Sequence, residues 1–513
     1  MTGAMTDAPI RRWPRWALWI SLALTLGLLA GDLARLIGTG WVNAFYPYDL
    51  DYGEGIVWQQ MVNIVAGRGY APLGVYPAIV YHYPPVYHLV VGAASALFGS
   101  DGLVTGRLVS LAATLVMIAV IGRLAFAAIP SDTHRRVRIL AAIIAGGYVA
   151  SIPTIAAWAG YMRVDMLATA LSLVGLWLTL GAAERPGRLI LAALCFVLAI
   201  YTKQTSIAGP IAAFVALWLV RPRAAWILFG LCTVLGLSAL AGLSVMTAGG
   251  FLRHTLLYNL NRVDPSRLPL FLLILMPQVV AIAIAALAVA MTWQRLRPAA
   301  FRALRERLRA QGTDRNEFAA VLMLAFLVLK TAMLPTVLKS GATDNYLIEW
   351  LCAIGVFVGI GVVPVLAVAL DDRPWPRALL VAMVLIGLPI QAYRSFAAVR
   401  EDRVGDVLHR DLVARIARSP RPVISDEMVL LIRAGQPVLW EPAIVAELSH
   451  AGLYDEAAFA RLVRDHRFGF FITVGDHGDH LYNERYNPAV ADAIDAAYPR
   501  RERRGPLTLH LPH

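Results

Sequence analysis

Charge and cysteine are both scarce in this sequence. Only 16% of its 513 residues are charged, whereas an average soluble domain has about 25%. Apolar residues make up 58% of the chain, and the mean hydropathy is +0.62. This composition excludes a soluble enzyme, a disordered chain and a fibrous protein. Cys195, Cys232 and Cys352 lie in apolar runs without metal-ligand spacing, which excludes a disulfide scaffold and argues against a cysteine nucleophile.

Phosphate-binding loops for nucleotides are also missing from the sequence, because it has neither a Walker-type loop nor a G-x-G-x-x-G motif after a strand. Lysine occurs only three times, so 43 of the 46 basic residues are arginine. The net charge is +12, but the last 119 residues carry 15 arginines and 17 acids, which leaves +14 for the apolar part. Basic residues that flank apolar runs reflect membrane topology, and no nucleic-acid partner is expected.

Eleven apolar runs divide most of the chain. The first, 16–37, follows Arg11, Arg12 and Arg15 and shows no cleavage site, so it is predicted to be a retained helix with a cytoplasmic N-terminus. The others are 107–129, 138–158, 165–183, 188–203, 206–220, 224–248, 268–292, 318–338, 346–370 and 377–394. With this topology the cytoplasmic segments contain 19 arginines and the opposite loops contain seven basic residues, as the positive-inside rule requires.

Two segments are therefore placed outside the cytoplasm. Residues 38–106 are rich in Tyr, Pro and Gly, and their apolar stretch PVYHLVVGAASALFG is too short to span, which predicts an interfacial helix. Residues 395–513, here called the tail, combine strand-like segments (RPVIS, QPVLWE, RFGFFITVG) with helix-like segments (EMVLLIRAG, EAAFARLVRDH, PAVADAIDAAY). We expect a mainly α protein with a membrane domain, 1–394, and a small extracytoplasmic α/β domain, 395–513.

Acidic and basic residues converge on the external side from distant parts of the sequence. They are Asp51 and Glu54 in PYDLDYGEG, Arg107 at the start of the second run, Arg163 and Asp165 in GYMRVDM, Lys203 in YTKQ, and Lys339. Charges at a bilayer are costly and suggest function. A carboxylate can remove a proton from a hydroxyl, and cations can stabilise a departing phosphate. The pattern predicts glycosyl transfer from a lipid-phosphate donor to an acceptor hydroxyl.

Each of these residues also has a structural explanation. The two acids fit a turn and a helix start, Arg163 and Asp165 fit a structural ion pair, Arg107 fits an interfacial anchor, and Lys203 and Lys339 fit snorkelling side chains. Lys330, nine residues before Lys339, is expected to face the bundle interior. The GDHGDH segment, 475–480, fits a loop after a strand better than a metal site. No metal site is assigned, no cofactor is identified, and a divalent-cation requirement stays open.

The order of these motifs resembles the GT-C superfamily of polyprenyl-phosphate-sugar-dependent membrane glycosyltransferases. The resemblance covers residues 40–210 and is nearest to the protein O-mannosyltransferase (family 39) and aminoarabinose transferase (family 83) branches. It rests on DYGEG, the Pro-Pro segment YPPVYHLVVGAASALFG, the arginine that opens the second run, MRVDM and YTKQ. It implies the GT-C fold and an inverting transferase of the bacterial inner membrane, with a lipid, glycan or protein acceptor.

The resemblance also assigns roles. It implies a catalytic base at Glu54 or Asp51, because the family often has adjacent Asp-Glu, whereas Gly53 precedes Glu54 here. The other matching positions, implied to bind the lipid phosphate or the sugar, are Arg107, Arg163, Asp165 and Lys203. The family often has lysine before Pro-Pro, but this chain has Tyr83, so the phosphate contact made there is either lost or supplied by His82 or Lys339.

Two other classes of function compete with a transferase. A transporter or flippase for lipid-linked sugars predicts repeat symmetry with interrupted helices at matching positions, and no such repeat is found. A membrane anchor for a binding tail leaves Lys330 and the acidic external loop without a role. Consumption of a polyprenyl-phosphate sugar separates the three, because only a transferase turns over the donor.

Overall fold

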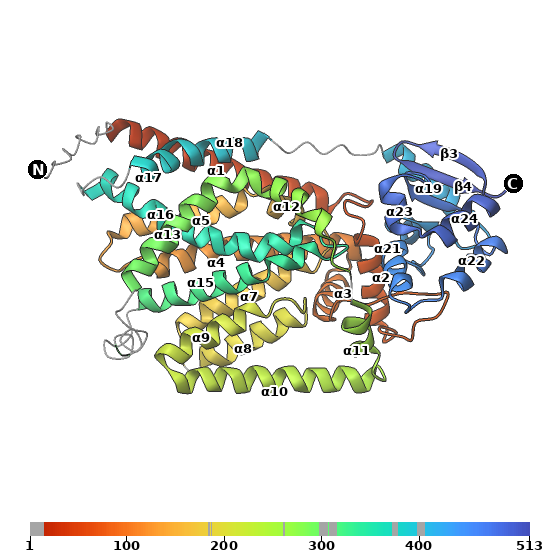
Figure 1. The fold of residues 1–513 in the computed structure, drawn as a ribbon, viewed down its shortest axis with the longest axis horizontal. Helices are drawn as coiled ribbons and strands as arrows, with labels where there is room; N and C mark the ends of the chain where they lie inside the picture. The colour runs from red at the N-terminus through yellow and green to blue at the C-terminus, as the bar shows by residue number, and fades with distance from the viewer. Residues whose placement is uncertain are drawn as a thin grey trace, which may run out of the picture.

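The computed structural model describes residues 15–182, 185, 187–259, 262–296, 306, 315–371, 378–397 and 406–513. These residues are mainly helical, and 18 helices have at least seven residues. Long helices run side by side along the molecule and form a bundle, and the tail caps one end of it (Figure 1). The predicted fold class, a helical membrane protein with a small α/β tail, is confirmed in this arrangement.

Each of the eleven predicted runs contains at least one helix of the bundle. These helices are α1 (Arg15–Ala44), α4 (Gly102–Ala128), α5 (Arg135–Ala150), α6 (Pro153–Trp158), α7 (Asp165–Leu180), α8 (Gly187–Ile200), α9 (Ala208–Val220), α10 (Pro222–Met246), α12 (Leu268–Leu275), α13 (Val279–Leu296), α15 (Arg315–Ala332), α16 (Ile348–Asp371), α17 (Ala378–Ala382) and α18 (Leu388–Ala397). Among the described residues, six helical spans are long and apolar enough to cross a membrane. The protein is therefore a multi-pass membrane protein, and the number of eleven crossings stays a prediction.

The core of the bundle forms around α16, because small residues let its neighbours approach closely. In the most apolar stretch of Asp344–Ala369, the span that contains α16, 89% of the residues are buried. A Cβ added at Gly359 would lie 2.8 Å from the Cβ of Ala145 on α5, and one at Gly355 would lie 2.5 Å from Val149 Cγ2. Close contact between small residues is the usual way to gain packing energy where helices have no water to exclude.

The first loop, defined here as residues 45–101 between α1 and α4, contains two helices. α2 (Glu54–Val65) starts within the DYGEG motif, and α3 (Val86–Phe98) starts directly after Pro84 and Pro85. A helix is thus observed at the predicted place as α3, its 13 residues span only about 20 Å, and its interfacial location stays a prediction. The short helix α11 (Gly250–Thr255) lies at the same end of the bundle (Figure 1).

The tail contains a four-stranded mixed sheet with the order β1-β2-β4-β3. β1 (Ile424–Ser425) is parallel to β2 (Phe471–Val474), whereas β4 (Leu507–Leu511) is antiparallel to both β2 and β3 (Arg500–Arg504). Its helices are α19 (Asp406–Ala417), α20 (Met428–Arg433), α21 (Pro442–His450), α22 (Glu456–Arg464), α23 (His480–Arg485) and α24 (Pro488–Ala497). Two predicted strands and all three predicted helices of the tail are observed.

Two features of the tail differ from the prediction. The QPVLWE segment is not a strand of the sheet, because Trp440 instead forms an isolated parallel bridge with Ala78 of the first loop. The β3–β4 hairpin was not predicted: RRERR of β3 contains no apolar residue and lacks the alternation that identifies a half-buried strand, whereas LTLHL of β4 does alternate and was missed. Its turn uses Gly505, which has a φ of 61°.

The tail packs directly on the first loop. Tyr46, Tyr48 and Ile56 of the loop share one apolar cluster with tail residues that include Leu412 and Leu430. Gly55 makes this contact possible, because an added Cβ would lie 2.5 Å from Met428 Cβ and 2.6 Å from the Val429 nitrogen of α20. The loop and the tail are therefore held at one fixed separation by backbone contact.

We expect Gly55→Ala to loosen the tail without unfolding the bundle. The added methyl group meets backbone atoms of α20, and such overpacking costs about 1–3 kcal/mol. Hydrogen–deuterium exchange should increase in 428–440 and 45–52. Gly74→Ala is the matched control in the same loop, since its Cβ meets only Pro77 O at 3.5 Å. Equal exchange in the two variants would contradict the tight contact.

Candidate functional site

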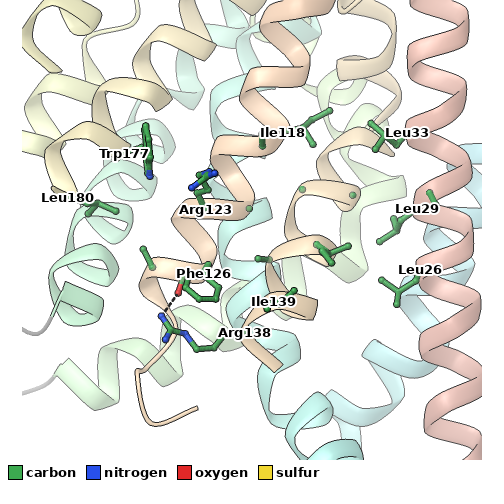
Figure 2. Close-up of a pocket in the computed structure, with 18 of the residues that line it drawn as sticks. Leu26, Leu29, Leu33, Ile118, Arg123, Phe126, Arg138, Ile139, Trp177 and Leu180 are labelled. Atoms are coloured by element: carbon green, nitrogen blue, oxygen red, sulfur yellow. Dashed lines mark hydrogen bonds between the residues drawn. The ribbon is translucent and has the colours of Figure 1, made fainter. Parts of the chain in front are cut away.

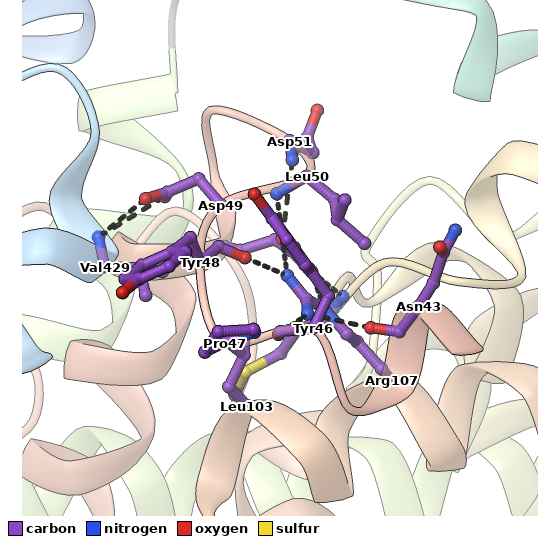
Figure 3. Close-up of polar contacts among 12 residues, drawn as sticks. Asn43, Tyr46, Pro47, Tyr48, Asp49, Leu50, Asp51, Leu103, Arg107 and Val429 are labelled. Carbon is purple, nitrogen blue, oxygen red and sulfur yellow. Dashed lines mark hydrogen bonds and ion pairs between the residues drawn. The ribbon is translucent and has the colours of Figure 1, made fainter. Parts of the chain in front are cut away.

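A buried ion pair organises the first loop. Arg107, on the second turn of α4, is fully buried and donates from Nε to Glu54 Oε1 at 2.7 Å and from Nη2 to Glu54 Oε2 at 2.6 Å. The same guanidinium donates to the carbonyl oxygens of Asn43, Tyr46 and Tyr48 at 2.9, 2.5 and 2.7 Å. Figure 3 shows Arg107 below the loop that carries Tyr46 and Tyr48. One side chain thus joins the end of α1, the loop and α2.

Glu54 is also saturated with backbone donors. Its Oε1 accepts from Met162 N at 2.7 Å, and its Oε2 accepts from Leu50 N at 2.8 Å and from Asp51 N at 3.4 Å. The residue is completely buried. A carboxylate with both oxygens occupied by a bidentate arginine and by amides has no lone pair available for a proton from a substrate. This geometry favours a positioning role for Glu54.

Asp51 has the opposite character. Its side chain keeps 24% of its accessible surface, and its Oδ2 pairs with Arg163 Nη1 at 3.0 Å and accepts from Gly53 N at 3.0 Å. Gly53 is required here, because a Cβ at this position would lie 1.4 Å from Arg163 Nη1. The Arg163 guanidinium also lies over the ring of Trp158, 5.3 Å from its centroid. Asp51 and Arg163 therefore form an accessible acid–base pair beside the buried Glu54.

A second pair lies where α7 begins and α8 ends. Lys203 Nζ donates to Asp165 Oδ1 at 2.5 Å, and Asn345 Nδ2 donates to the same oxygen at 2.8 Å. Lys330 and Glu349, both buried, form a further pair at 2.5 Å. These five residues line a cavity of about 20 Å³, enough for roughly one water molecule. Lys330 faces the bundle interior as expected, although α15 ends only two residues later.

Tyr83, which replaces the family's lysine, lies between these pairs. Its hydroxyl has Arg163, Asp165 and Lys203 as electrostatic neighbours. Burial raises the pKa of Tyr83 to about 12, so the phenol keeps its proton and can donate a hydrogen bond. Arg163 and Lys203 thus lie near a neutral hydrogen-bond donor at the tail end of the bundle.

His82 and Lys339 lie at the edge of this region. Burial lowers the pKa of His82 to about 3, with a further contribution from the charge of Arg163, so His82 is neutral at pH 7. Its carbonyl accepts from Gln204 Nε2 at 2.9 Å. Lys339 Nζ donates to the carbonyl and side-chain oxygens of Asn259 at 2.7 and 3.1 Å. Of the two predicted substitutes for the missing lysine, only Lys339 carries charge.

One carboxyl group near the site was not predicted from the sequence. Glu441 of the tail is 5% exposed, and its Oε2 is buried and accepts no hydrogen bond from the described residues. Arg163, Arg485 and Tyr52 are its electrostatic neighbours. Burial raises the pKa of Glu441 to about 7, although the two arginines oppose the shift. No sequence motif marks Glu441, because only the docking of the tail brings it to the loop.

Among the described residues, no group of three or more His, Cys, Asp or Glu side chains could hold a metal ion. The GDHGDH segment follows β2 as a loop, as predicted. Its acids pair within the tail: Asp476 contacts Arg501 at 3.1 Å and Asp479 accepts from the Asp476 backbone at 2.9 Å.

The two acids of the loop should respond differently to neutralisation. Glu54→Gln leaves Arg107 buried without a counter-charge, and breaking a buried pair costs about 3–5 kcal/mol. Asp51→Asn affects a partly exposed pair, for which the cost is about 0–1 kcal/mol. Thermal unfolding of the purified variants in detergent should show a clear loss of stability for Glu54→Gln alone. Equal losses would disprove the distinction.

The raised pKa of Glu441 predicts a pH-dependent stability. In the unfolded state the Glu441 carboxyl releases its proton near pH 4.5, whereas in the folded state it keeps the proton up to about pH 7. The free energy of unfolding therefore falls as pH rises from 4.5 through about 7. Glu441→Gln cannot ionise and should gain about 2–3 kcal/mol relative to the parent between pH 5 and pH 8. Urea unfolding followed in the tail measures this difference. The exposed Glu484→Gln is the control, and a constant difference for Glu441→Gln would refute the prediction.

Comparison with solved structures identifies the fold. The chain matches ArnT from Cupriavidus metallidurans bound to undecaprenyl phosphate with a TM-score of 0.56 and 15% identity, covering 96% of this chain and 97% of that one. It matches an apo form of the Archaeoglobus fulgidus oligosaccharyltransferase with a TM-score of 0.53 and 10% identity, covering 91% and 70%. No family model matches the sequence. No curated protein sequence matches it either.

At these identities the likeness establishes the fold alone. The match extends over nearly the whole chain, including the tail, whereas the sequence motifs covered only residues 40–210. The protein thus has the GT-C-like fold expected from its motifs, which it shares with ArnT and the archaeal oligosaccharyltransferase.

Proposed function

We propose that this protein is an integral membrane glycosyltransferase that moves a sugar from a polyprenyl-phosphate donor to an acceptor hydroxyl. The observation that carries the proposal is the accessible Asp51–Arg163 pair, which lies close to the buried Lys203–Asp165 pair at the tail end of the bundle. The shared fold supports it, because ArnT has been solved with undecaprenyl phosphate and the archaeal enzyme with an acceptor peptide.

Asp51 is the base in this proposal. Its carboxylate takes the proton of the acceptor hydroxyl while that oxygen attacks the anomeric carbon of the donor sugar. The bond between this carbon and the phosphate oxygen breaks, its electrons stay on the phosphate, and the configuration at the carbon inverts. Burial raises the pKa of Asp51, although the charge of Arg163 opposes this shift. The raised pKa makes the Asp51 carboxylate a better proton acceptor than a solvated carboxylate.

Cations near the membrane surface take up the charge that develops on the leaving group. The phosphodiester donor has one negative charge, and the departing polyprenyl phosphate gains a second as the bond breaks. Cationic groups that interact more strongly with the transition state than with the bound donor lower the activation barrier, instead of only tightening donor binding. Arg163, Lys203 and Lys339 are assigned to this task, with Tyr83 as a neutral donor between the first two.

The remaining residues position this machinery. Arg107 and Glu54 hold the loop that presents Asp51, and Asp165 orients Lys203. His82, buried and neutral, is assigned to shaping the sugar pocket rather than to the phosphate. The site and the tail lie at the extracytoplasmic face of a bacterial plasma membrane, and the N-terminus lies in the cytoplasm. The lipid tail of the donor then stays in the bilayer beside the bundle.

We expect Asp51→Asn to abolish transfer while the protein stays folded. Loss of a general base lowers the rate by about 10²–10⁴-fold. Gly53→Ala should have a similar effect with every charge retained, because its methyl group displaces the Arg163 guanidinium. Purified protein in liposomes is mixed with a panel of polyprenyl-phosphate hexoses and pentoses, and donor consumption is followed by mass spectrometry.

Asp264→Asn is the matched control, since Asp264 is an exposed acid in the loop before α12. It should keep full activity. Full activity in Asp51→Asn as well would disprove the assignment of the base. A parent protein that equilibrates the donor between leaflets but leaves it intact would overturn the transferase proposal and favour a transporter.

A further inference from the structure

A large apolar groove opens on the membrane domain far from Asp51. Its volume is about 780 Å³, within the range of pockets that take small molecules. Figure 2 shows Leu26, Leu29 and Leu33 of α1 on one side and Ile118 and Ile139 of α4 and α5 across from them. Arg123, which also lines the groove, lies 16 residues along α4 from Arg107, or about 24 Å. The groove is therefore separate from the site described above.

The polar residues of the groove are predominantly cationic. Arg123, Arg138 and Arg315 line it, and no carboxylate is among the described lining residues. Arg138 is anchored to the end of α4, where its Nη2 donates to Phe126 O at 3.0 Å and its guanidinium lies 4.1 Å from the centroid of the Phe126 ring. The groove thus combines apolar walls with fixed positive charge.

Arg123 lacks a counter-charge in the described part of the chain. It forms neither a hydrogen bond nor an ion pair there, and its recorded contact is with the ring of Trp177, 5.6 Å away. Its position is five residues before the end of α4, about 7.5 Å along the helix axis. A cation at this depth normally meets a partner, because leaving it unpaired at the edge of the hydrocarbon is costly.

We propose that this groove binds an anionic glycerophospholipid from the membrane leaflet opposite the tail. The lipid phosphate contacts Arg123 and Arg138, and an acyl chain lies between α1 and the α4–α5 pair. Basic pockets between membrane helices bind anionic headgroups in this way. Charge complementarity selects the occupant, since a zwitterionic lipid offers the arginines no net negative charge. The bound lipid would hold α1 against α4 and α5, whose residues line the groove.

The proposal is tested with the purified full-length protein, delipidated in a neutral detergent and titrated with phosphatidylglycerol or phosphatidylcholine. Native mass spectrometry counts the lipids retained. The parent should prefer phosphatidylglycerol, and Arg123→Gln should reduce that preference about fivefold, the effect of one cation near a membrane surface, about 1 kcal/mol. Ile139→Trp keeps the charges but fills the groove, and it should lower retention of both lipids.

Arg136→Gln is the matched control, because Arg136 is an exposed arginine at the start of α5 that does not line the groove. It should leave the lipid preference unchanged. Equal retention of the two lipids by the parent, or equal effects of Arg123→Gln and Arg136→Gln, would show unspecific annular lipid and overturn the proposal. Displacement of phosphatidylglycerol by polyprenyl phosphate would overturn the assigned occupant, while the glycosyl-transfer assay tests the proposed function separately.

Discussion

The architecture of the tail end of the bundle depends on the buried pair of Arg107 and Glu54. Five donor–acceptor contacts of one guanidinium hold the end of α1, the first loop and the start of α2 around the second turn of α4. Burying two charges has a large desolvation cost, which is offset only when geometry and additional hydrogen bonds are good. Here every charged oxygen has donors, so the pair fixes the loop in one conformation and thereby fixes Asp51.

This arrangement gives different surroundings to two acids that the sequence places three residues apart, and the proposed function assigns the chemistry to Asp51 alone. Glu54 is surrounded by donors and buried, and Asp51 remains partly accessible. The contrast resembles a general rule for catalytic carboxyl pairs, in which the environment rather than the residue type separates a structural role from a chemical one. Gly53 completes the division, because its missing side chain leaves the space that the Arg163 guanidinium occupies beside Asp51.

The helices of the bundle could be predicted because apolar runs bounded by arginine reflect a strong physical constraint. The α/β character of the tail followed from local periodicity, but RRERR of β3 has no apolar alternation and was missed. Convergence of Asp51, Arg163, Asp165 and Lys203 was predictable from topology, since all lie at helix ends on one side. Their pairing was not, because Arg163 partners Asp51 rather than the nearby Asp165, and this choice depends on loop packing.

Glu441 shows the limit of sequence reasoning most clearly. It lies almost 400 residues from Asp51 and belongs to no motif, and it reaches the loop because the tail docks there, with α20 packed against Gly55. Hydrogen bonds from tail backbone amides, such as Val438 N to Gln59 Oε1 at 3.0 Å, complete this contact. A residue that reaches a site through domain docking has no local pattern from which to infer it.

The shortness of α7 has a consequence for substrate choice. Its 16 residues measure about 24 Å, less than the roughly 30 Å of hydrocarbon in a typical bilayer. In the proposed topology, Asp165 at the start of α7 and its partner Lys203 are recessed below the surface of the bilayer. A water-soluble sugar nucleotide would have to shed its hydration shell to descend there. A phosphate on a membrane-embedded chain is already held at that depth, so under the proposed function this recession favours a lipid-linked donor.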